Sequence, residues 1–187
     1  MTSLYKNKTW ELVKRPKDRR VVRCKWIFKI KEGLSGSEPR RFKARLVAKG
    51  YTQKEGIDFK KVFSPVVIHA LITVILAITA VQDMELDQLD VKTSFLHGRL
   101  EKEILMSQPE GYVFPGKEYH VCQLKKSLYE LKQSSRQWYL RFDEFMQMHE
   151  LVRCNYDCCV YYKIIKDSLY IYLILYVDDV SIYGYKY

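Results

Sequence analysis

Tyr176-Val177-Asp178-Asp179, close to the C-terminus, is the stretch around which the predicted fold is organised. The preceding run, Leu169-Tyr-Ile-Tyr-Leu-Ile-Leu175, is apolar at odd and even positions alike, which is typical of a strand covered on both faces. Val180-Ser-Ile-Tyr183 alternates and is predicted to be its hairpin partner. Two adjacent carboxylates are therefore expected at the tip of a hairpin. Because two-residue turns favour Asn-Gly or Asp-Gly, turn formation alone does not explain Asp-Asp beside a β-branched Val.

A third aspartate, Asp90, lies at the end of a strand predicted over Met84–Val91. The segment before it, Val66–Val81, follows Pro65 and lacks turn residues, so a buried helix is expected there, with His69 as a core histidine. Neighbouring strands lie about 4.8 Å apart. If the strand of Asp90 lies beside the hairpin, the three carboxylates share one small site.

Three carboxylates in one site need a cation. At about 4 Å and an effective dielectric near 20, each like-charge pair costs on the order of 4 kcal/mol. A few hard oxygen ligands suit Mg²⁺ better than a dedicated Ca²⁺ cage, and two such ions roughly 3.5–4 Å apart support phosphoryl transfer. An Asp-Asp pair by itself is weak support, because most acidic loop tips are only solvated turns.

The N-terminal region is predicted to form a basic β-hairpin. A short strand is expected over Trp10–Val13, and Val21–Lys31 alternates as a half-buried strand. A flexible loop over Gly33–Pro39 then leads to a strand over Arg41–Lys49. The outer face would carry the basic residues Arg23, Lys25, Lys29 and Lys31. Lysines on edge strands often serve only against aggregation, but four on one face favour contact with phosphates.

The charge of the chain is concentrated in this same region. The formal net charge is +10, and residues 14–61 hold 17 Lys and Arg against 5 Asp and Glu, so the rest of the chain is slightly acidic. A confined basic patch is expected for proteins that contact phosphate backbones. An ordinary solvated basic surface is the alternative that charge alone leaves open.

The remaining elements complete an α+β pattern. Gly50–Lys61 is turn-like. Further strands are expected over Ile104–Met106, His120–Leu124 and Cys158–Ile165. Ser134–Glu150 is predicted to be a helix whose apolar stripe serves packing: Trp138, Phe142, Phe145 and Met146. Strands and helices do not alternate regularly, so an antiparallel α+β arrangement is expected rather than βαβ winding.

The cysteines and the hydropathy indicate the cellular compartment in which the chain is expected. Five cysteines without a CxxC pair indicate reduced, intracellular thiols. Cys154, Cys158 and His149 lack a fourth ligand at finger-like spacing, so zinc is not expected. No apolar segment follows Met1, and Val66–Val81 is shorter than the roughly 20 residues that span a bilayer. Neither a signal peptide nor a membrane partner is expected.

Eight ordered blocks of the sequence resemble the reverse transcriptase region of copia-type LTR retrotransposon Pol polyproteins. The blocks are Trp10–Val13, Lys25–Lys29, Lys43–Gln53, Phe63–Val66, Gln88–Gly98, Gln108–Gly111, Ser127–Tyr129 and Tyr176–Asp179. They cover nearly the whole chain in order, so coincidence is a poor explanation.

The resemblance implies a right-hand polymerase and roles for particular residues. Asp90, Asp178 and Asp179 would be catalytic and bind Mg²⁺, with Mn²⁺ as an alternative ion. Phe95 would stack under the incoming sugar and reject a 2′-hydroxyl. The incoming nucleotide would also contact Arg45, Lys29, Lys31 and Tyr129, and residues 129–134 would lie against the nascent base pair. The nucleic acid would contact Arg23, Lys25, Arg41, Lys43 and Lys49.

The resemblance also implies an organisation and partners. Fingers would comprise residues 1–66 and 98–132, and palm residues 67–97 and 133–187. The chain ends eight residues after Asp179, so the rest of the palm, the thumb and RNase H are expected to be missing and the isolated fragment inactive. Expected partners are an RNA or DNA template–primer, dNTP and other Pol polyprotein domains, inside the cell in a cytoplasmic retrotransposon particle.

Departures from the family pattern keep two other functions open. The family usually has Gly where Glu130 and Glu150 stand; Glu150 is expected to strain a helix-end turn, and Glu130 to place negative charge near the template–nucleotide pocket. One rival function is a catalytically inactive remnant that binds nucleic acid through its basic fingers. The other is a domain kept for protein interaction, which no sequence feature specifically supports.

Overall fold

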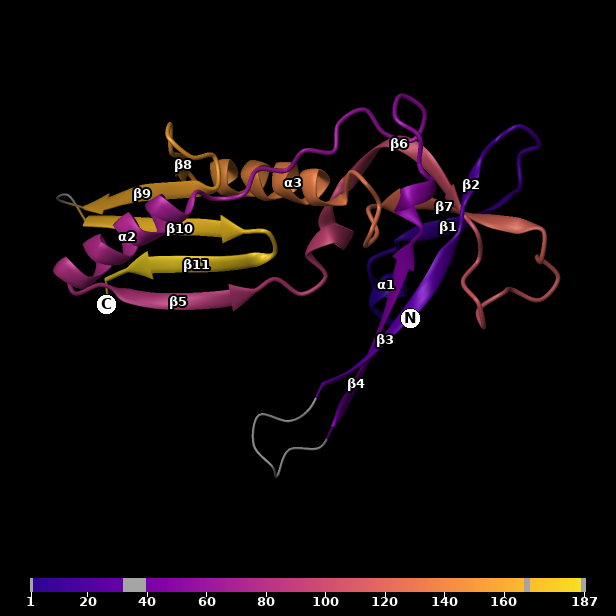
Figure 1. The fold of residues 1–187 in the computed structure, drawn as a ribbon, viewed down its shortest axis with the longest axis horizontal. Coiled ribbons are helices and arrows are strands. Elements are labelled where there is room, and N and C mark those ends of the chain that lie inside the picture. The colour runs from indigo at the N-terminus through magenta and orange to yellow at the C-terminus, as the bar shows by residue number, and fades with distance from the viewer. Residues whose placement is uncertain (1, 32–39, 167–168, 186–187) are drawn as a thin grey trace. The chain divides into compact units, whose positions relative to one another are not determined.

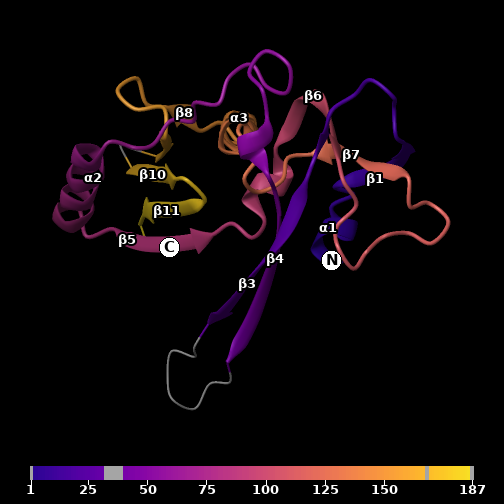
Figure 2. The same cartoon turned by 45° about the vertical axis from the view of Figure 1, so that its right-hand side comes forward.

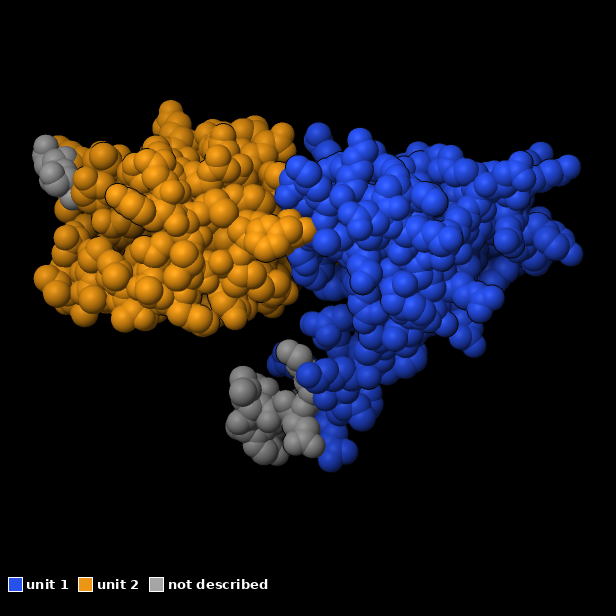
Figure 3. Space-filling model, turned by 45° about the horizontal axis from the view of Figure 1, so that its top comes forward, with its two compact units in different colours: residues 1–62, 95–137 blue, residues 63–94, 138–187 orange. Residues whose placement is uncertain are grey.

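The computed structural model describes residues 2–31, 40–166 and 169–185, and it divides into two compact units. Unit 1 comprises residues 1–62 and 95–137, and unit 2 comprises residues 63–94 and 138–187 (Figure 3). Each unit is thus built from two separate parts of the sequence. The elements are a mixture of short helices and strands, mostly antiparallel, so the predicted α+β class is confirmed (Figure 1).

Unit 1 has a four-stranded sheet in the order β1-β7-β6-β2. Its strands are β1 (Trp10–Lys14), β7 (His120–Lys126), β6 (Arg99–Met106) and β2 (Val21–Val22). β1, β7 and β6 pair antiparallel, whereas β2 joins β6 in parallel, which departs from the purely antiparallel expectation. The helix α1 (Thr2–Lys6) and the 3₁₀ turns η1 (Gly50–Thr52) and η2 (Ser94–His97) complete this part of the fold. Leu96, Ile104, Met106 and Leu128 form the centre of the buried core.

A long two-stranded ribbon extends from the rest of unit 1 (Figure 2). It consists of β3 (Cys24–Lys31) paired antiparallel with β4 (Arg41–Ala48), which confirms the predicted basic hairpin. The loop predicted over 33–39 lies outside the described residues.

Two expectations about this ribbon were wrong. The single strand expected over Val21–Lys31 breaks at Arg23, because β2 pairs with β6 while β3 turns to pair with β4. The apolar face was expected to be buried, yet Phe28 is 76% exposed and Phe42 is 81% exposed. Two strands without a second layer bury apolar side chains only near the core.

Unit 2 contains a five-stranded antiparallel sheet in the order β5-β11-β10-β9-β8. The strands are β5 (Glu85–Asp90), β11 (Asp179–Gly184), β10 (Leu169–Tyr176), β9 (Val160–Lys166) and β8 (Val152–Arg153). The helices α3 (Ser134–Met148) and α2 (His69–Val81) lie on opposite faces of this sheet (Figures 1 and 2). β10 is accordingly buried at three consecutive positions, 173–175, whereas its first half is only partly covered.

The helix α2 differs from the buried helix expected over Val66–Val81. It begins at His69, after Ile68 in an extended conformation, and Ile75 and Thr79 are its buried residues. Val81 is 86% exposed, and His69 is exposed at the first helical position rather than being a core histidine. The helix contacts the sheet along one side only, so its uniformly apolar sequence overstated its burial.

No helix within the described ranges is both long enough and apolar enough to cross a membrane.

The predicted packing stripe on α3 is largely confirmed. Trp138, Phe142 and Met146 are buried, whereas Phe145 is exposed, with its ring centroid 4.2 Å from that of His149.

The helix α3 also buries the carboxylate of Asp143. Its partners are the hydroxyl of Tyr161 at 2.8 Å, Nε2 of Gln147 at 2.8 Å and Nη1 of Arg153 at 3.1 Å. Burial, together with the hydrogen bond to Asp143, raises the pKa of Tyr161.

A left-handed residue ends α3, as the sequence predicted. Glu150 has φ 63°, its N–H donates to the carbonyl of Gln147 at 3.0 Å, and the N–H of Leu151 donates to the carbonyl of Met146 at 3.0 Å. These two hydrogen bonds define a Schellman motif, whose left-handed position strongly favours Gly. The side chain of Glu150 also forms an exposed ion pair with Lys163 at 2.9 Å.

Glu150→Gly is therefore expected to stabilise the chain. Relief of a left-handed non-glycine residue is worth about 1–2 kcal/mol, and the lost surface ion pair costs about 0.2–1 kcal/mol. Urea unfolding should show a net gain of about 0.5–1 kcal/mol. Glu150→Ala is the matched control, because it removes the same ion pair but keeps the Cβ, and it should destabilise. If both variants shift stability in the same direction, backbone strain at Glu150 is refuted.

Candidate active site

The turn between β10 and β11 presents the Asp-Asp pair in an unexpected way. Its two central residues are Val177 and Asp178, while Asp179 is already the first residue of β11 and pairs with Tyr176. The two carboxylates were expected side by side at the tip, so this detail was wrong. Val177 has φ 60°, at a turn position where type II′ hairpins take Gly. A β-branched residue there is strained.

The third aspartate, Asp90, lies beside the hairpin, as expected from the sequence. β5 pairs with β11 so that Asp90 is directly opposite Asp179, and the N–H of Val91 donates to the carbonyl of Asp178 at 3.3 Å. The backbone thus gathers all three aspartates at one end of the unit 2 sheet. Asp178 and Asp179 are half-buried and Asp90 is exposed. Within the described part of the chain, none of the three carboxylates has a hydrogen-bond or ion-pair partner.

The carboxylates do not converge to ion-binding distances. In the described ranges, the only group of three ligating side chains with all ligand atoms within 4.8 Å is Asp157, Cys158 and Cys159. Both oxygens of Asp157 already accept backbone hydrogen bonds, from Ile68 N at 2.7 Å and Cys159 N at 2.8 Å. Burial raises the pKa of the Cys159 thiol to about 12, which disfavours the thiolate that a metal needs. This group is therefore structural, and all five cysteines are free thiols.

Three residues with predicted nucleotide contacts meet in unit 1. The guanidinium of Arg45 on β4 lies over the ring of Tyr129, 5.9 Å from its centroid. The ring of Phe95 contacts the same Tyr129 edge-on, with centroids 5.0 Å apart. The three residues come from distant parts of the sequence, and their roles in binding stay predictions.

The cations of the ribbon share one face. In β3–β4, Ile27 is opposite Arg45 and Lys29 is opposite Lys43, and opposed side chains of antiparallel strands point to the same side. By this register the basic face carries Lys25, Lys29, Arg41, Lys43 and Arg45. Arg23 and Lys49 lie at the base of the ribbon, where the N–H of Lys49 donates to the carbonyl of Arg23 at 2.7 Å. The side chain of Lys31 lies outside the described residues.

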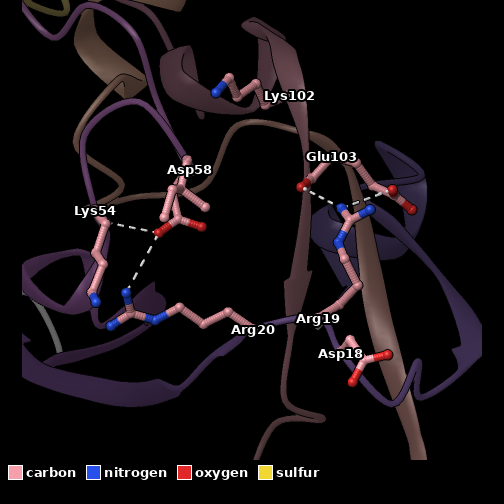
Figure 4. Close-up of a pocket in the computed structure, with 8 residues that line it drawn as sticks. Asp18, Arg19, Arg20, Lys54, Asp58, Lys102 and Glu103 are labelled. Carbon is pink, nitrogen blue, oxygen red and sulfur yellow. Dashed lines mark hydrogen bonds and ion pairs between the residues drawn. The ribbon is translucent and has the colours of Figure 1, made fainter.

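A cavity of about 730 Å³ in unit 1 contains none of the predicted site residues (Figure 4). Its charged lining residues are Asp18, Arg19, Arg20, Lys54, Asp58, Lys102 and Glu103. Arg19 pairs with Glu103 at 2.9 Å, and Arg20 lies 3.9 Å from Asp58. Opposite charges already face each other across this cavity, so its structure gives no reason to assign it a ligand.

Backbone packing fixes the loop that carries Tyr129. The N–H of Ala48 donates to the carbonyl of Tyr129 at 3.0 Å, and Glu130 has φ 65°. A Cβ added to Gly50 would come 1.8 Å from the carbonyl oxygen of Glu130. Gly50 is therefore needed for this close approach.

One residue near the aspartates was expected only to pack. The indole N–H of Trp138 donates to the carbonyl of Val177 at 2.8 Å, so α3 contacts the turn itself. A helical stripe predicts that the ring is buried but says nothing about the acceptor of its N–H. The only available clue was that a buried indole N–H usually has a partner.

The fold and these sites define an α+β protein with an acidic hairpin turn in one unit and a basic ribbon in the other. Residues 7–187 match the family model described as reverse transcriptase (RNA-dependent DNA polymerase). The chain belongs to this reverse transcriptase family.

Several relatives of the chain are polyproteins of transposons. The chain is 52% identical over 184 residues to the retrovirus-related Pol polyprotein from transposon TNT 1-94 of Nicotiana tabacum, covering 98% of this chain and 14% of that protein. It is 37% identical to the Pol polyprotein from transposon RE1 of Arabidopsis thaliana, covering 95% and 12%. It is 26% identical to the Ty1-MR1 Gag-Pol polyprotein of Saccharomyces cerevisiae, covering 98% and 10%. No solved structure matches the chain.

These matches confirm the resemblance found in the sequence, to the reverse transcriptase region of a retrotransposon Pol polyprotein. The chain spans only 14% or less of the length of the three relatives described.

Proposed function

We propose that this chain is the nucleotidyl-transfer part of an RNA-directed DNA polymerase, which joins a dNTP to the 3′-hydroxyl of a primer. One observation carries the proposal: Asp179 lies opposite Asp90 in the sheet, and Asp178 lies in the adjoining turn. The family match supports the reaction class.

The three aspartates fit a divalent cation by their chemistry. Their carboxylates are hard oxygen donors, partly open to solvent, and have no protein partner in the described ranges. Asp90, Asp178 and Asp179 would hold Mg²⁺, with Mn²⁺ as an alternative. When bound, two such ions activate the attacking hydroxyl and stabilise the leaving oxygen in phosphoryl transfer.

Residues of unit 1 would bind the incoming nucleotide. Arg45 and Lys29 lie on the basic face of the ribbon, where they would hold the triphosphate. The cation–π contact over Tyr129 restricts the orientation of the Arg45 guanidinium. The edge-on contact with Tyr129 also fixes the ring plane of Phe95, so that a rigid ring would exclude a 2′-hydroxyl by shape.

The two units support an assignment to polymerase subdomains. We assign unit 1, with the basic ribbon, to the fingers and unit 2, with the three aspartates, to the palm. The template–primer would be RNA or DNA, and Lys25, Arg41 and Lys43 would contact its phosphates, with Arg23 and Lys49 at the base of the ribbon. Other Pol polyprotein domains and a cytoplasmic particle complete the proposed context.

Primer extension tests the polymerase proposal directly. The chain is incubated with an RNA template annealed to a labelled DNA primer, dNTP and Mg²⁺, and the primer length is followed with time. Extension that requires Mg²⁺ and discriminates against rNTP is expected from a Pol polyprotein that contains this chain, because the 187 residues alone are expected to be inactive. A failure to extend under Mg²⁺ and Mn²⁺ alike, in the chain and in the polyprotein that contains it, would overturn the proposal.

A second function rests on the basic face alone: nucleic-acid binding by a chain without catalytic activity. Lys29 and Lys43 are opposite each other in the middle of that face. For the double variant Lys29→Gln, Lys43→Gln, the slope of log affinity against log salt should fall in magnitude by about two, one for each lost phosphate contact. Fluorescence anisotropy with a labelled duplex at several salt concentrations measures this slope.

The matched control neutralises two exposed lysines of unit 1 outside the ribbon, Lys117 and Lys125. Lys117→Gln with Lys125→Gln removes the same net charge and should leave the slope nearly unchanged. Equal slopes for the ribbon variant and the control would show that binding reflects net charge only.

A further inference from the structure

The turn that carries Asp178 holds a strained backbone conformation. Val177 precedes Asp178 with φ 60°, in the left-handed region that β-branched residues avoid. A two-residue loop with Gly at this position would form without strain. Contacts from outside the turn must therefore select the conformation that is present.

Both central carbonyls of the turn receive such contacts. The Val177 carbonyl accepts the indole N–H of Trp138 at 2.8 Å, and the Asp178 carbonyl accepts the N–H of Val91 at 3.3 Å. The first donor comes from α3 and the second from the residue after Asp90. The peptide units on both sides of the Asp178 side chain are therefore held by other elements of unit 2.

The indole is fixed by the core around it. Trp138 is 6% exposed, and its ring packs on Phe142 with centroids 5.6 Å apart. Phe142 in turn contacts Tyr161 edge-on at 5.7 Å. A buried indole N–H needs an acceptor, and the Val177 carbonyl meets that need, so the two groups constrain each other.

We propose that Trp138 is a positioning residue: its N–H holds the backbone conformation of the Val177–Asp178 turn from which the Asp178 carboxylate would bind a cation together with Asp179 and Asp90. This inference rests on the proposed function of the three aspartates. A positioning role and a packing role depend on different parts of the Trp138 side chain. Packing needs the ring of Trp138, whereas positioning needs its N–H.

Trp138→Phe separates these roles, because it keeps an aromatic ring and removes the donor. Mn²⁺ affinity, followed by the paramagnetic resonance signal of free Mn²⁺, needs no turnover. In the full 187-residue chain, the affinity is expected to fall about tenfold, the scale seen when outer-shell partners of metal ligands are removed. In the polymerase assay, the Mg²⁺ concentration for half-maximal rate should rise similarly, with an unchanged KM for template–primer.

Two further variants keep the test decisive. Trp26→Phe removes an indole hydrogen bond of similar length but more exposed, to the carbonyl of Glu110 at 3.0 Å in unit 1, and should leave Mn²⁺ affinity unchanged. Val177→Gly removes the strain, so in that background Trp138→Phe should cost only about threefold. If Trp138→Phe alone does not fold, the Mn²⁺ affinity of Val177→Gly is compared with that of the double variant Val177→Gly, Trp138→Phe.

The outcomes separate the two proposals. Binding that is weakened by Asp178→Asn but not by Trp138→Phe, in either background, overturns the positioning role and leaves the metal site intact. Wild-type protein that binds no Mn²⁺, or binding that is indifferent to Asp178→Asn, overturns the proposed metal site and this inference together. A tenfold loss for Trp26→Phe as well would show a general effect of lost packing and would also overturn the inference.

Discussion

Asp178→Asn is expected to remove primer extension almost completely while the chain remains folded. The substitution keeps the size of the side chain and deletes one of the three charges that the register places around Asp179. Loss of one preorganised charge-stabilising group costs on the order of 10²–10³-fold in rate, and a cation ligand should cost at least as much. Single-turnover extension at saturating Mg²⁺ measures this loss.

A second acid on the same strand as Asp90 provides the control. Asp87 is exposed on β5 and lies opposite Ile182, not in the turn. Asp87→Asn removes the same charge from the same sheet and should keep wild-type activity within about twofold, as expected for an exposed surface substitution. Asp90→Asn should match Asp178→Asn. If Asp87→Asn is as damaging as the other two, net charge rather than a shared metal site explains the loss.

Stability should respond in the opposite direction to activity. Removing a charge from a group of like charges relieves repulsion, so Asp178→Asn is expected to melt no lower than wild type when Mg²⁺ is absent. Added Mg²⁺ should raise the melting temperature of the wild type more than that of the variant, because a ligand that binds only the folded state stabilises it. This contrast separates loss of the site from loss of the fold.

Local patterns in the sequence predicted the elements on which the candidate site is built. Alternation predicted β3, a second strand was expected where β4 lies, and the apolar run before Asp178 predicted β10 with its partner β11. The strand that carries Asp90 was expected beside this hairpin. That strand is β5, and it pairs with β11. Side-chain periodicity follows from burial, so patterns of this kind report reliably which strands form.

The details that local patterns missed depend on partners distant in sequence. The break at Arg23 follows from β2 pairing with β6, which lies about 80 residues away. The exposure of Phe28 and Phe42 follows from the absence of a second layer over the ribbon in the described residues. The acceptor of the Trp138 N–H and the carbonyl next to Gly50 are likewise set by loops that no periodic signal describes.

Two strained backbone positions were predictable from the sequence. Glu130 and Glu150 stand where Gly is usual in the family, and both have positive φ, at 65° and 63°. The first contacts Gly50 next to Tyr129, and the second ends α3. The same elements carry residues assigned to the candidate site, so relaxing either turn changes stability and site geometry together.

Gly50→Ala is expected to destabilise unit 1 strongly and to disturb its nucleotide-binding residues. The new Cβ would lie 1.8 Å from the oxygen and 2.9 Å from the carbon of the Glu130 carbonyl, and both are backbone atoms that cannot rotate away. Forced displacement in a packed region costs about 1–3 kcal/mol or more. The neighbouring carbonyl of Tyr129 accepts the Ala48 N–H, so displacement of the Glu130 backbone should also shift the Tyr129 ring relative to Phe95 and Arg45. Urea unfolding and the KM for dNTP report the two effects.

Gly56→Ala is the matched control in the same unit. Gly56 has φ 79° and open space around its Cβ position, so its substitution measures left-handed strain without a steric clash. It should cost about 1 kcal/mol and leave the KM for dNTP unchanged. Glu130→Gly added to Gly50→Ala should recover part of the lost stability, because glycine lets the 129–131 backbone move away from the new methyl group. Glu150→Gly should add the same gain in wild type and in Gly50→Ala, whereas Glu130→Gly should add more in Gly50→Ala than in wild type, and that excess would locate the clash at the carbonyl of residue 130. Equal melting of Gly50→Ala and wild type would instead mean that the close backbone contact between Gly50 and Glu130 does not exist in solution.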